Sequence, residues 1–300
     1  MSKFDITVLT DDRYESPKET NAYIDNLLQE DSYIVDALLA EGLTVNRKSW
    51  ASKSFHWEDT RYALFRTTWD YFERFDEFIR WLGKASRQTK LINEFKLAQW
   101  NLDKHYLIDL QNNGVRIVRT RFVKPNEKTT LEDQLALADC AAGAVLKPSI
   151  SGAARHTYRL QPHNIDNHEA VFQRLIKYES MMIQPFLDSI IKKGEISLIV
   201  IDGKHTHAVL KKAKFGDFRV QDDFGGTVHP YEATPEEIAI AEKAVAACPY
   251  HPLYARVDLV WDQNDELAVS ELELIEPELF FRNRPEAAAL LAQAIAKYAE

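Results

Sequence analysis

Several classes of protein are excluded by what this sequence lacks. No stretch approaches the roughly 20 uninterrupted apolar residues of a membrane-spanning helix. The first residues, MSKFDITVLTDD, show no basic start followed by an apolar signal core. Only two cysteines occur, Cys140 and Cys248, far apart and without a metal-ligand spacing. We therefore expect a soluble, cytoplasmic protein in a reducing compartment, with no membrane as a partner.

Common catalytic and cofactor motifs are also missing. The first strand-like segment is not followed by the G-x-G-x-x-G of dinucleotide-binding proteins, and the chain has no G-x-x-x-x-G-K-[ST] phosphate loop. It also lacks the G-x-S-x-G turn of many serine hydrolases, and its histidines show no H-E-x-x-H spacing. These absences disfavour a dinucleotide-dependent enzyme, a P-loop NTPase, a common serine hydrolase and a zinc protease.

The composition that is present is ordinary for a globular protein, but its charge is uneven. The 300 residues are 45% apolar and 28% charged, enough for two or three packed subdomains. A formal net charge of −9 argues against a general nucleic-acid binder. Eight carboxylates and no lysine or arginine lie between Val257 and Glu278, so the rest of the chain is nearly neutral. Such a block of charge indicates a bound cation or a solvated loop.

Hydrophobic patterning predicts a first part that mixes strands and helices. Strand-like segments at 4–10, 43–50 and 61–71 alternate with helical patterns at 21–41 and 71–82. This order favours an open α/β layer.

The pattern changes after residue 100. Helices are expected at 101–110 and 131–142, and each is followed by a strand. The small and polar segment 149–160 is typical of a mobile connection rather than of a core element. Short strands and helices alternate through the rest, up to a C-terminal helix from about Pro285. No repeat or proline-rich linker marks a boundary, so we expect interlocking parts.

The segment from Ala255 to Pro277 carries the sharpest functional signal. It reads as two strands joined by the polar turn DQND, and residues two apart on a strand share a face, so Glu271 and Glu273 point the same way. Asp258 on the first strand would lie opposite or diagonal to this pair. Three converging carboxylates suit a hard divalent cation, magnesium above all, completed by phosphate oxygens. A solvated strand face over inward leucines is the alternative.

Basic side chains accompany loops of small residues. Lys147 ends an apolar strand just before the loop from Ser149 to Gly152, where a lysine and loop amides can hold a phosphate group. Lys104 is a second candidate for the same task. Arg219 precedes a Gly-Gly pair and could clamp a carboxylate or phosphate with its planar fork. Taken alone, each of these residues is more often a solvated surface charge.

The segment RTTWDY, from Arg66 to Tyr71, ends a strand of the first part. Ligands usually bind at strand ends in an open sheet. The alternative is that Trp69 and Tyr71 are packing residues and Asp70 is a helix cap. The pattern leaves both interpretations open.

Taken in order, these segments resemble the ATP-grasp superfamily from about Phe4 to Phe281. The similarity is greatest to the branch with bacterial glutathione synthetase, the ribosomal-protein glutamate ligases and the D-cycloserine-forming cyclo-ligase. The matching motifs are LFRTTWDY, WNLDKHYLIDLQNNGV, AVLKPSISGAARHT, MMIQPFLDSIIKKGEISLIVIDG, VLKKAKFGDFRVQDDFGG, and ARVDLV with ELELIEP. Such a set in the family's order is hard to produce by chance.

The resemblance implies an α+β fold in which ATP lies between two α+β subdomains, next to an α/β-like N-terminal domain. On this basis we expect a preATP-grasp and substrate domain at residues 1–100, a central, lid-like ATP-grasp subdomain at 101–180, and a second subdomain with the metal site at 181–300. The implied chemistry is phosphorylation of a substrate carboxylate by ATP, followed by attack of an amine on the acylphosphate.

Individual roles carry over from the family's motifs. Lys104 and Lys147 match the two lysines that bind ATP, and Glu195 matches the acidic residue that takes the ribose hydroxyls. Arg219 matches the arginine that neutralises the transferring phosphoryl group, so Arg219 and Lys147 are the expected catalytic residues. The hinge that would bind adenine through its backbone consists of Gln184, Pro185, Phe186 and Leu187.

The same carry-over concerns the metal and the flap. Asp258, Glu271 and Glu273 match the magnesium ligands, although many relatives have asparagine in place of Glu273. The loop from Ser149 to His156 matches the mobile flap over the phosphates, whose closure keeps water from an acylphosphate. ATP and two Mg²⁺ ions, for which Mn²⁺ can substitute, are the expected cofactors.

The sequence therefore predicts an ATP-dependent carboxylate–amine ligase acting on an amino acid or small peptide. Its partners are expected to be small-molecule carboxylate and amine substrates. The oligomeric state is left open by the sequence, and the resemblance allows a homo-oligomer, because relatives are often dimers or tetramers. An intramolecular cyclo-ligase acting on a ureido or similarly substituted amino acid is one alternative, and a non-catalytic ATP-binding regulatory module is another. The expected substrate residues are Arg66, Asp70, Arg219, Arg282 and Asn283.

Overall fold

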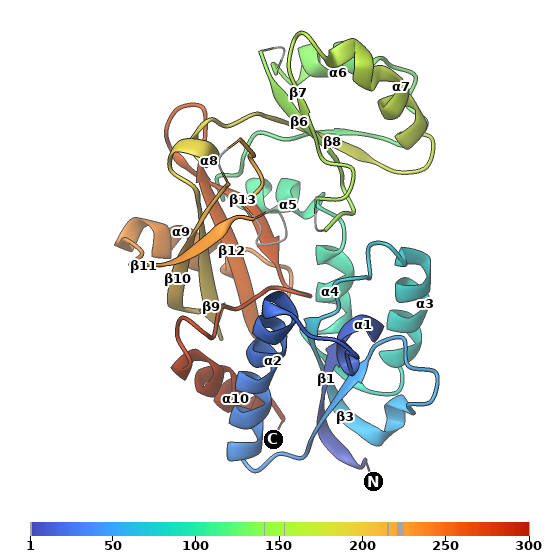
Figure 1. Cartoon of the computed structure of the whole chain (residues 1–300), viewed down its shortest axis with the longest axis vertical. Helices are drawn as coiled ribbons and strands as arrows, with labels where there is room; N and C mark the ends of the chain where they lie inside the picture. Colours follow the sequence, from blue (N-terminus) through green and yellow to red (C-terminus); the bar gives the residue numbers. More distant parts are fainter. Residues whose placement is uncertain (1, 141, 153, 215, 221–224, 300) are drawn as a thin grey trace.

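The computed structural model describes residues 2–140, 142–152, 154–214, 216–220 and 225–299. Three sheets organise the chain, and helices cover each of them (Figure 1). The predicted α+β class with an α/β-like first part is confirmed. No helix in the described residues is long and apolar enough to cross a membrane.

The first sheet is parallel throughout, in the order β2-β1-β3-β4. Helix α2 begins at Asn21, whose side chain accepts a hydrogen bond from the Ile24 N–H at 2.9 Å, and it stops before Gly42. The elements of this first part are β1 (Phe4–Thr10), α1 (Asp12–Glu15), α2 (Ala22–Ala40), β2 (Val45–Ser49), η1 (Trp57–Asp59), β3 (Thr60–Thr67), α3 (Phe75–Ala85) and β4 (Lys90–Ile92).

The C-terminal helix α10 (Glu286–Ala299) returns to this first part and lies beside α2 (Figure 1). The two helices share one buried core with β1 and β3, to which Ile34, Leu38, Leu291 and Ile295 contribute. The end of the chain is therefore tied to the first sheet by apolar burial.

The second sheet has the order β5-β8-β6-β7 and is antiparallel. Helices α6 and α7 bury Leu131, Leu135 and Phe172 in one core with its strands. Its elements are β5 (Arg121–Val123), α6 (Leu131–Leu137), β6 (Ala144–Pro148), β7 (Tyr158–Leu160), α7 (Ile165–Leu175) and β8 (Met181–Pro185).

The third sheet, in the order β11-β10-β9-β12-β13, is also antiparallel. Its helix α9 begins with a capping box between Thr234 and Glu237. The elements of this third part are α8 (Ser189–Lys192), β9 (Glu195–Ile201), β10 (Lys204–Lys212), β11 (Thr227–Tyr231), α9 (Pro235–Ala246), β12 (Tyr254–Trp261) and β13 (Leu267–Glu273).

Two sequence predictions about elements are wrong. The helix predicted at 101–110 is two short helices, α4 (Phe95–Asn101) and α5 (Tyr106–Asn112), because the backbone N–H of Lys104 donates instead to Ser149 O at 2.9 Å. The strand predicted after it is reduced to β5. The predicted domain boundaries stay predictions, although β8 lies in the second sheet and α10 packs on the first part.

Candidate active site

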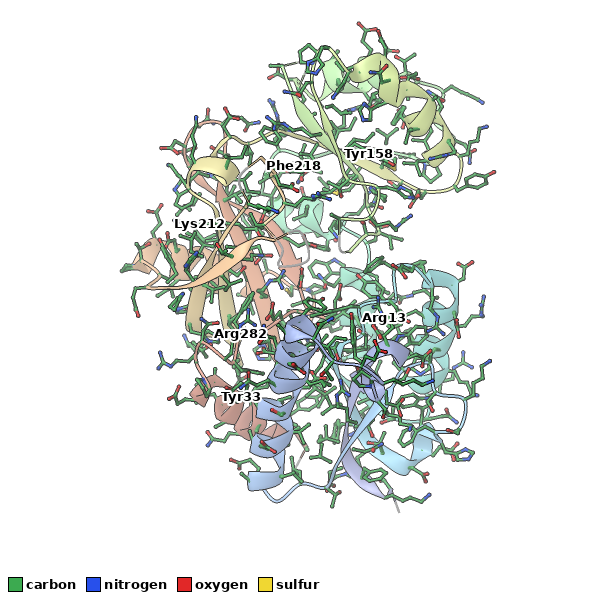
Figure 2. The ribbon with its side chains drawn as sticks, viewed as in Figure 1. Arg13, Tyr33, Tyr158, Lys212, Phe218 and Arg282 are labelled. Atoms are coloured by element: carbon green, nitrogen blue, oxygen red, sulfur yellow. The ribbon has the colours of Figure 1, made fainter. Side chains whose placement is uncertain are left out.

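A cavity of about 410 Å³ opens where the three parts of the chain meet. Its wall combines side chains that are remote in sequence, such as Trp69 of the first part, Lys147 of the second and Asp258 of the third. Figure 2 shows Arg13 and Phe218, which also line it, in separate parts of the molecule. A cavity of this kind, between packed parts of one chain, is where substrates usually bind.

The carboxylates of the β12–β13 hairpin meet in this cavity. The register pairs Asp258 with Glu271 and Arg256 with Glu273, so the predicted convergence of Asp258 with the glutamates is confirmed. Leu272 on the other face is buried, as the alternation predicts. The face with the carboxylates therefore points to the cavity and not to bulk solvent.

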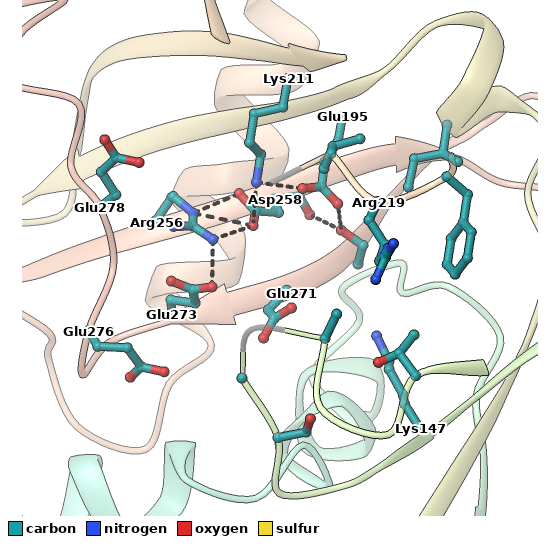
Figure 3. Close-up of a pocket in the computed structure, with 18 of the residues that line it drawn as sticks. Lys147, Glu195, Lys211, Arg219, Arg256, Asp258, Glu271, Glu273, Glu276 and Glu278 are labelled. Atoms are coloured by element: carbon teal, nitrogen blue, oxygen red, sulfur yellow. Dashed lines mark hydrogen bonds and ion pairs between the residues drawn. The ribbon is translucent and has the colours of Figure 1, made fainter. Parts of the chain in front are cut away.

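Two protein cations hold Asp258 (Figure 3). Arg256 donates from Nε to Asp258 Oδ1 at 3.0 Å and from Nη2 to Oδ2 at 2.8 Å, and Lys211 Nζ lies 3.2 Å from Oδ2. Ser197 Oγ adds a hydrogen bond of 2.5 Å to Oδ1. Burial alone would raise the pKa of Asp258, but these cations outweigh it and hold the pKa well below its usual range.

The same cations reach two further carboxylates. Arg256 Nη2 lies 2.5 Å from Glu273 Oε1, and Lys211 Nζ lies 2.5 Å from Glu195 Oε1. Gly194 makes this second pairing possible, because a Cβ there would come within 2.4 Å of Lys211 O and its φ is +92°. The backbones of Glu195 and Lys211 can therefore pair directly at the start of β9.

Lys104, in the turn between α4 and α5, and Lys147, on β6, approach the carboxylates from another side of the cavity. Lys104 Nζ lies 3.0 Å from Glu271 Oε1 and donates to Ser151 O at 2.6 Å. Burial would lower the pKa of Lys104, but Glu271 outweighs it and raises the pKa. Lys147 makes no side-chain hydrogen bond or ion pair with any residue that the structure describes, and burial lowers its pKa. Lys147 is therefore a half-buried cation in the cavity wall whose ammonium group makes no hydrogen bond or ion pair within the described residues.

Apolar side chains line the cavity around the end of β8. Gln184 Nε2 donates to Thr120 Oγ1 at 2.9 Å, and the Phe186 N–H donates to Gly143 O at 3.1 Å, which fixes the segment after the strand. Arg159 stacks on the ring of Phe186 at 3.7 Å from its centroid. The apolar lining side chains here are Val118, Val145, Phe186, Leu187, Ile190, Phe218, Val220 and Val260. Such a slot suits a flat heteroaromatic ring.

Arg219 lies at the cavity wall on the segment that follows β10. It pairs with Asp217 at 2.7 Å, and this pairing lowers the pKa of Asp217 and raises that of Arg219. The motif around it includes Phe215 and residues 221–224, which lie outside the described residues, as does Ala153 in the loop after β6.

The other expected substrate residues do not line the cavity. Arg66 is 1% exposed and donates to Pro277 O at 3.0 Å. Asp70 accepts from Trp50 Nε1 at 2.6 Å and from Arg74 at 2.7 Å. Arg282 pairs with Glu278, and the Asn283 N–H donates to Phe280 O at 2.9 Å. Apart from Arg219, the residues predicted to bind substrate lie outside the cavity lining, and their role in substrate binding stays a prediction.

The sequence interpretation missed several charged groups in the wall. Arg256 shares a strand face with Asp258, two residues away, so the period-2 argument could have found it. Lys211 could not be placed, because its contact with Asp258 requires the strand order β10-β9-β12. Glu276 follows β13 and also lines the cavity.

The donor set suits a hard cation, but the side chains are arranged around protein cations. No group of three His, Cys, Asp or Glu side chains is in metal-binding geometry within the described part of the chain. Asp258, Glu271 and Glu273 nevertheless offer the oxygen ligands that Mg²⁺ prefers. Metal binding at these residues would require Arg256, Lys211 and Lys104 to give up their contacts.

The cavity with its carboxylates and lysines is typical of one class of enzyme, and two family models that match the chain indicate the same class. Residues 120–263 match the family model of the ATP-grasp domain of prokaryotic glutathione synthetase. Residues 6–93 match the N-terminal domain of the D-cycloserine synthetase DcsG. The chain belongs to the ATP-grasp superfamily of ligases, which confirms the predicted fold and the prediction of an ATP-dependent enzyme that forms carbon–nitrogen bonds.

Individual relatives make the similarity more specific. The chain is 30% identical to the cycloserine biosynthesis protein DcsG of Streptomyces lavendulae over 281 residues, 88% of this chain and 92% of that protein. The crystal structure of D-cycloserine synthetase DcsG superposes with a TM-score of 0.87 at 27% identity, covering 98% of this chain and 99% of that one. D-alanine–D-alanine ligase from Bacillus anthracis shares the fold with a TM-score of 0.66 at 14% identity, covering 99% of this chain and 97% of that one.

Proposed function

We propose that this protein is an intramolecular ATP-dependent ligase, a cyclo-ligase of the D-cycloserine-forming type. The observation that carries the proposal is the similarity to D-cycloserine synthetase through both the N-terminal part and the ATP-grasp part. The N-terminal part contributes Tyr14, Tyr23 and Trp69 to the cavity wall, so we expect similarity in this part to bear on which molecule is joined. A two-substrate carboxylate–amine ligase is the alternative outcome of the test below.

We place ATP along the cavity from the apolar slot to the lysines. The segment from Gln184 to Leu187 would bind adenine through its backbone, and Glu195 would take the ribose hydroxyls after leaving Lys211. Lys104 and Lys147 would hold the phosphates. Lys147 supports this placement best, because a half-buried cation without a hydrogen bond or ion pair in the described residues can pair directly with an incoming phosphate.

We assign Asp258, Glu271 and Glu273 to Mg²⁺ that accompanies ATP, with two ions as the expected number. Bound there, Mg²⁺ would neutralise charge on the phosphate oxygens. The chain's own contribution before the ion binds is to keep Asp258 and Glu271 ionised, because Arg256 and Lys104 lower their pKa values, while burial raises the pKa of Glu273.

The proposed reaction has two steps. A substrate carboxylate oxygen attacks the γ-phosphorus, the bond from that phosphorus to the bridging oxygen breaks, and ADP leaves. The substrate's own nitrogen then attacks the acyl carbon and loses a proton, while the bond to the phosphate oxygen breaks and inorganic phosphate leaves. Arg219 and Lys147 would stabilise the charge on the moving phosphoryl group.

The loop after β6 would exclude water from the acylphosphate between these steps. Ser149 and Ser151 are buried, and both carbonyls accept hydrogen bonds from Lys104. A side chain that binds phosphate thereby also fixes the loop that covers it. Water exclusion matters because an acylphosphate hydrolyses readily.

The test is an ADP-release screen with ATP, Mg²⁺ and a panel of D- and L-amino acids that carry O-ureido or related side-chain substituents. Mass spectrometry then identifies the product. A product with the mass of one substrate less one water supports cyclisation, as does that mass less HNCO, where a ureido nitrogen has attacked and its carbamoyl group is then lost by hydrolysis to CO₂ and NH₃. A product with the mass of two joined substrates supports the alternative. Glu271→Gln serves as the inactive control. Absence of ADP release from every substrate would refute the proposed activity.

A further inference from the structure

The end of the cavity that faces the N-terminal part contains a carboxylate without a cation. Glu276 lies on the segment after β13, and Figure 3 shows its side chain directed into the space that Glu271 and Glu273 also face. Within the described residues it has no ion pair, whereas Glu278, two residues further on, is paired with Arg282. Glu276 is hydrogen-bonded by the phenol of Tyr71, which is 4% exposed.

Aromatic side chains form the wall next to this carboxylate. Tyr14 meets Trp69 edge-on with ring centroids 6.2 Å apart, and Tyr23 lies 6.3 Å from Trp69. All three rings line the cavity. Trp69 Nε1 donates to the backbone carbonyl of Glu276 at 2.9 Å, so the wall and the carboxylate are held together. An aromatic wall beside a carboxylate is the arrangement that recognises an organic ammonium group.

The charges around Glu276 point to the same ligand. Burial raises the pKa of Glu276 to about 7, against the opposing effects of Tyr71 and Lys104. Lys104 is already paired with Glu271, and the nearby Glu271 itself works against ionisation of Glu276. A half-buried carboxylate of this kind is stabilised by a cation that arrives with a ligand.

We propose that Glu276, set against the wall of Tyr14, Tyr23 and Trp69, binds the ammonium group of an amino-acid substrate. Tyr71 acts as a positioning residue that orients the carboxylate. This inference rests on the proposed function and makes it more specific, because it orients the substrate. The ammonium group lies at the end near the N-terminal part, and the carboxylate to be activated points to Lys104 and Lys147.

The experiment measures binding of D-cycloserine and of isoxazolidin-3-one, the same ring without the amino group, by calorimetry. Each ligand is titrated into the wild type, Glu276→Gln and the matched control Glu278→Gln. Glu278 also lines the cavity but is already paired with Arg282. Removing a charge-assisted hydrogen bond should weaken D-cycloserine binding to Glu276→Gln by about tenfold to 100-fold. Binding of the ring without the amino group should be unchanged. ATP titration checks that each variant is folded.

The possible results distinguish failure of the ammonium site from failure of the proposed function. If Glu276→Gln binds D-cycloserine as tightly as the wild type does, the ammonium site is wrong and the proposed function stands. If the wild type binds ATP but not D-cycloserine, the D-cycloserine-type function fails, and the site fails with it. Should Glu276→Gln not fold, the wild type alone decides, because equal affinity for the two rings would overturn the proposal.

Discussion

A methyl group added at Gly152 should misalign the loop that covers the phosphates. A Cβ at this position would lie 2.6 Å from both Cδ1 and Cε1 of Phe72, which belongs to the N-terminal part. Carbon atoms pack at about 3.5–4.0 Å, so the ring or the loop has to move by about 1 Å. The neighbouring Ser151 carbonyl accepts the hydrogen bond from Lys104 Nζ, and a loop shift would therefore displace that ammonium group as well.

Two magnitudes follow for Gly152→Ala. Overpacking of a tight contact costs about 1–3 kcal/mol of folding free energy. A misplacement of about 1 Å in positioned groups can lower the rate by up to about 100-fold. We expect kcat to fall by about 10- to 100-fold. The ratio of ADP released to ligated product should rise above one, because water would reach the acylphosphate.

The assay is a coupled ADP measurement with product quantified by mass spectrometry, supported by thermal unfolding. Phe72→Leu in the Gly152→Ala background removes the ring that clashes and should restore part of kcat and of the coupling ratio. Gly83→Ala in α3 is the matched control, because a Cβ there meets nothing within 4 Å. Wild-type coupling in Gly152→Ala, or no rescue by Phe72→Leu, would refute the steric reasoning.

Further substitutions test single groups of the site and the core. Glu271→Gln should lower ADP release at least about 100-fold with little change in Tm, and full activity would remove Glu271 from the metal site. Lys147→Met should raise the KM for ATP while Tm stays equal or rises, because a half-buried cation with no ion pair in the described residues, whose charged form burial disfavours, is removed; a large drop in Tm would contradict this. Glu30 is 3% exposed, and burial raises its pKa from 4.5 to about 7. Because this pKa is raised in the folded state, the free energy of unfolding of the wild type falls as pH rises from about 4.5 to about 7. Glu30→Gln should remove up to about 3 kcal/mol of this fall, measured as the difference between the free energies of unfolding in urea at pH 4.5 and 8. An unchanged pH dependence would refute the role of Glu30.

Local patterns in the sequence predicted the part of the site that depends on strand geometry. The alternation in β13 and the polar turn before it fix the hairpin register, and Asp258 does pair with Glu271. The open α/β layer of the first part followed in the same way from its strand and helix patterns. Such features depend on neighbours within one or two elements, which a periodicity argument can reach.

Features that depend on remote contacts could not be predicted. Arg66 ends a strand, as a ligand-binding residue often does, but the segment after Glu276 folds over it, and its guanidinium donates to Pro277 O. The aromatic wall draws Tyr14, Tyr23 and Trp69 from separate elements. No local pattern indicates these contacts, because they form only when remote segments of the chain pack together in the folded protein.

The charged side chains that line the cavity form two groups: those with an ion-pair partner among the described residues and those without one. Lys211 and Arg256 satisfy Glu195, Asp258 and Glu273, and Lys104 satisfies Glu271. These contacts let a dense cluster of carboxylates fold before any ligand binds, since a buried charge without a partner is far more costly than a paired one. Lys147 and Glu276 are half-buried, cavity-lining groups of opposite charge without an ion-pair partner among the described residues, whereas Glu73, which also lines the cavity without an ion pair, is exposed. A phosphate group would pair with Lys147, and an ammonium group would pair with Glu276. The two charges therefore orient a zwitterionic substrate in the cavity, with its ammonium group at Glu276 and its carboxylate toward the phosphate at Lys147.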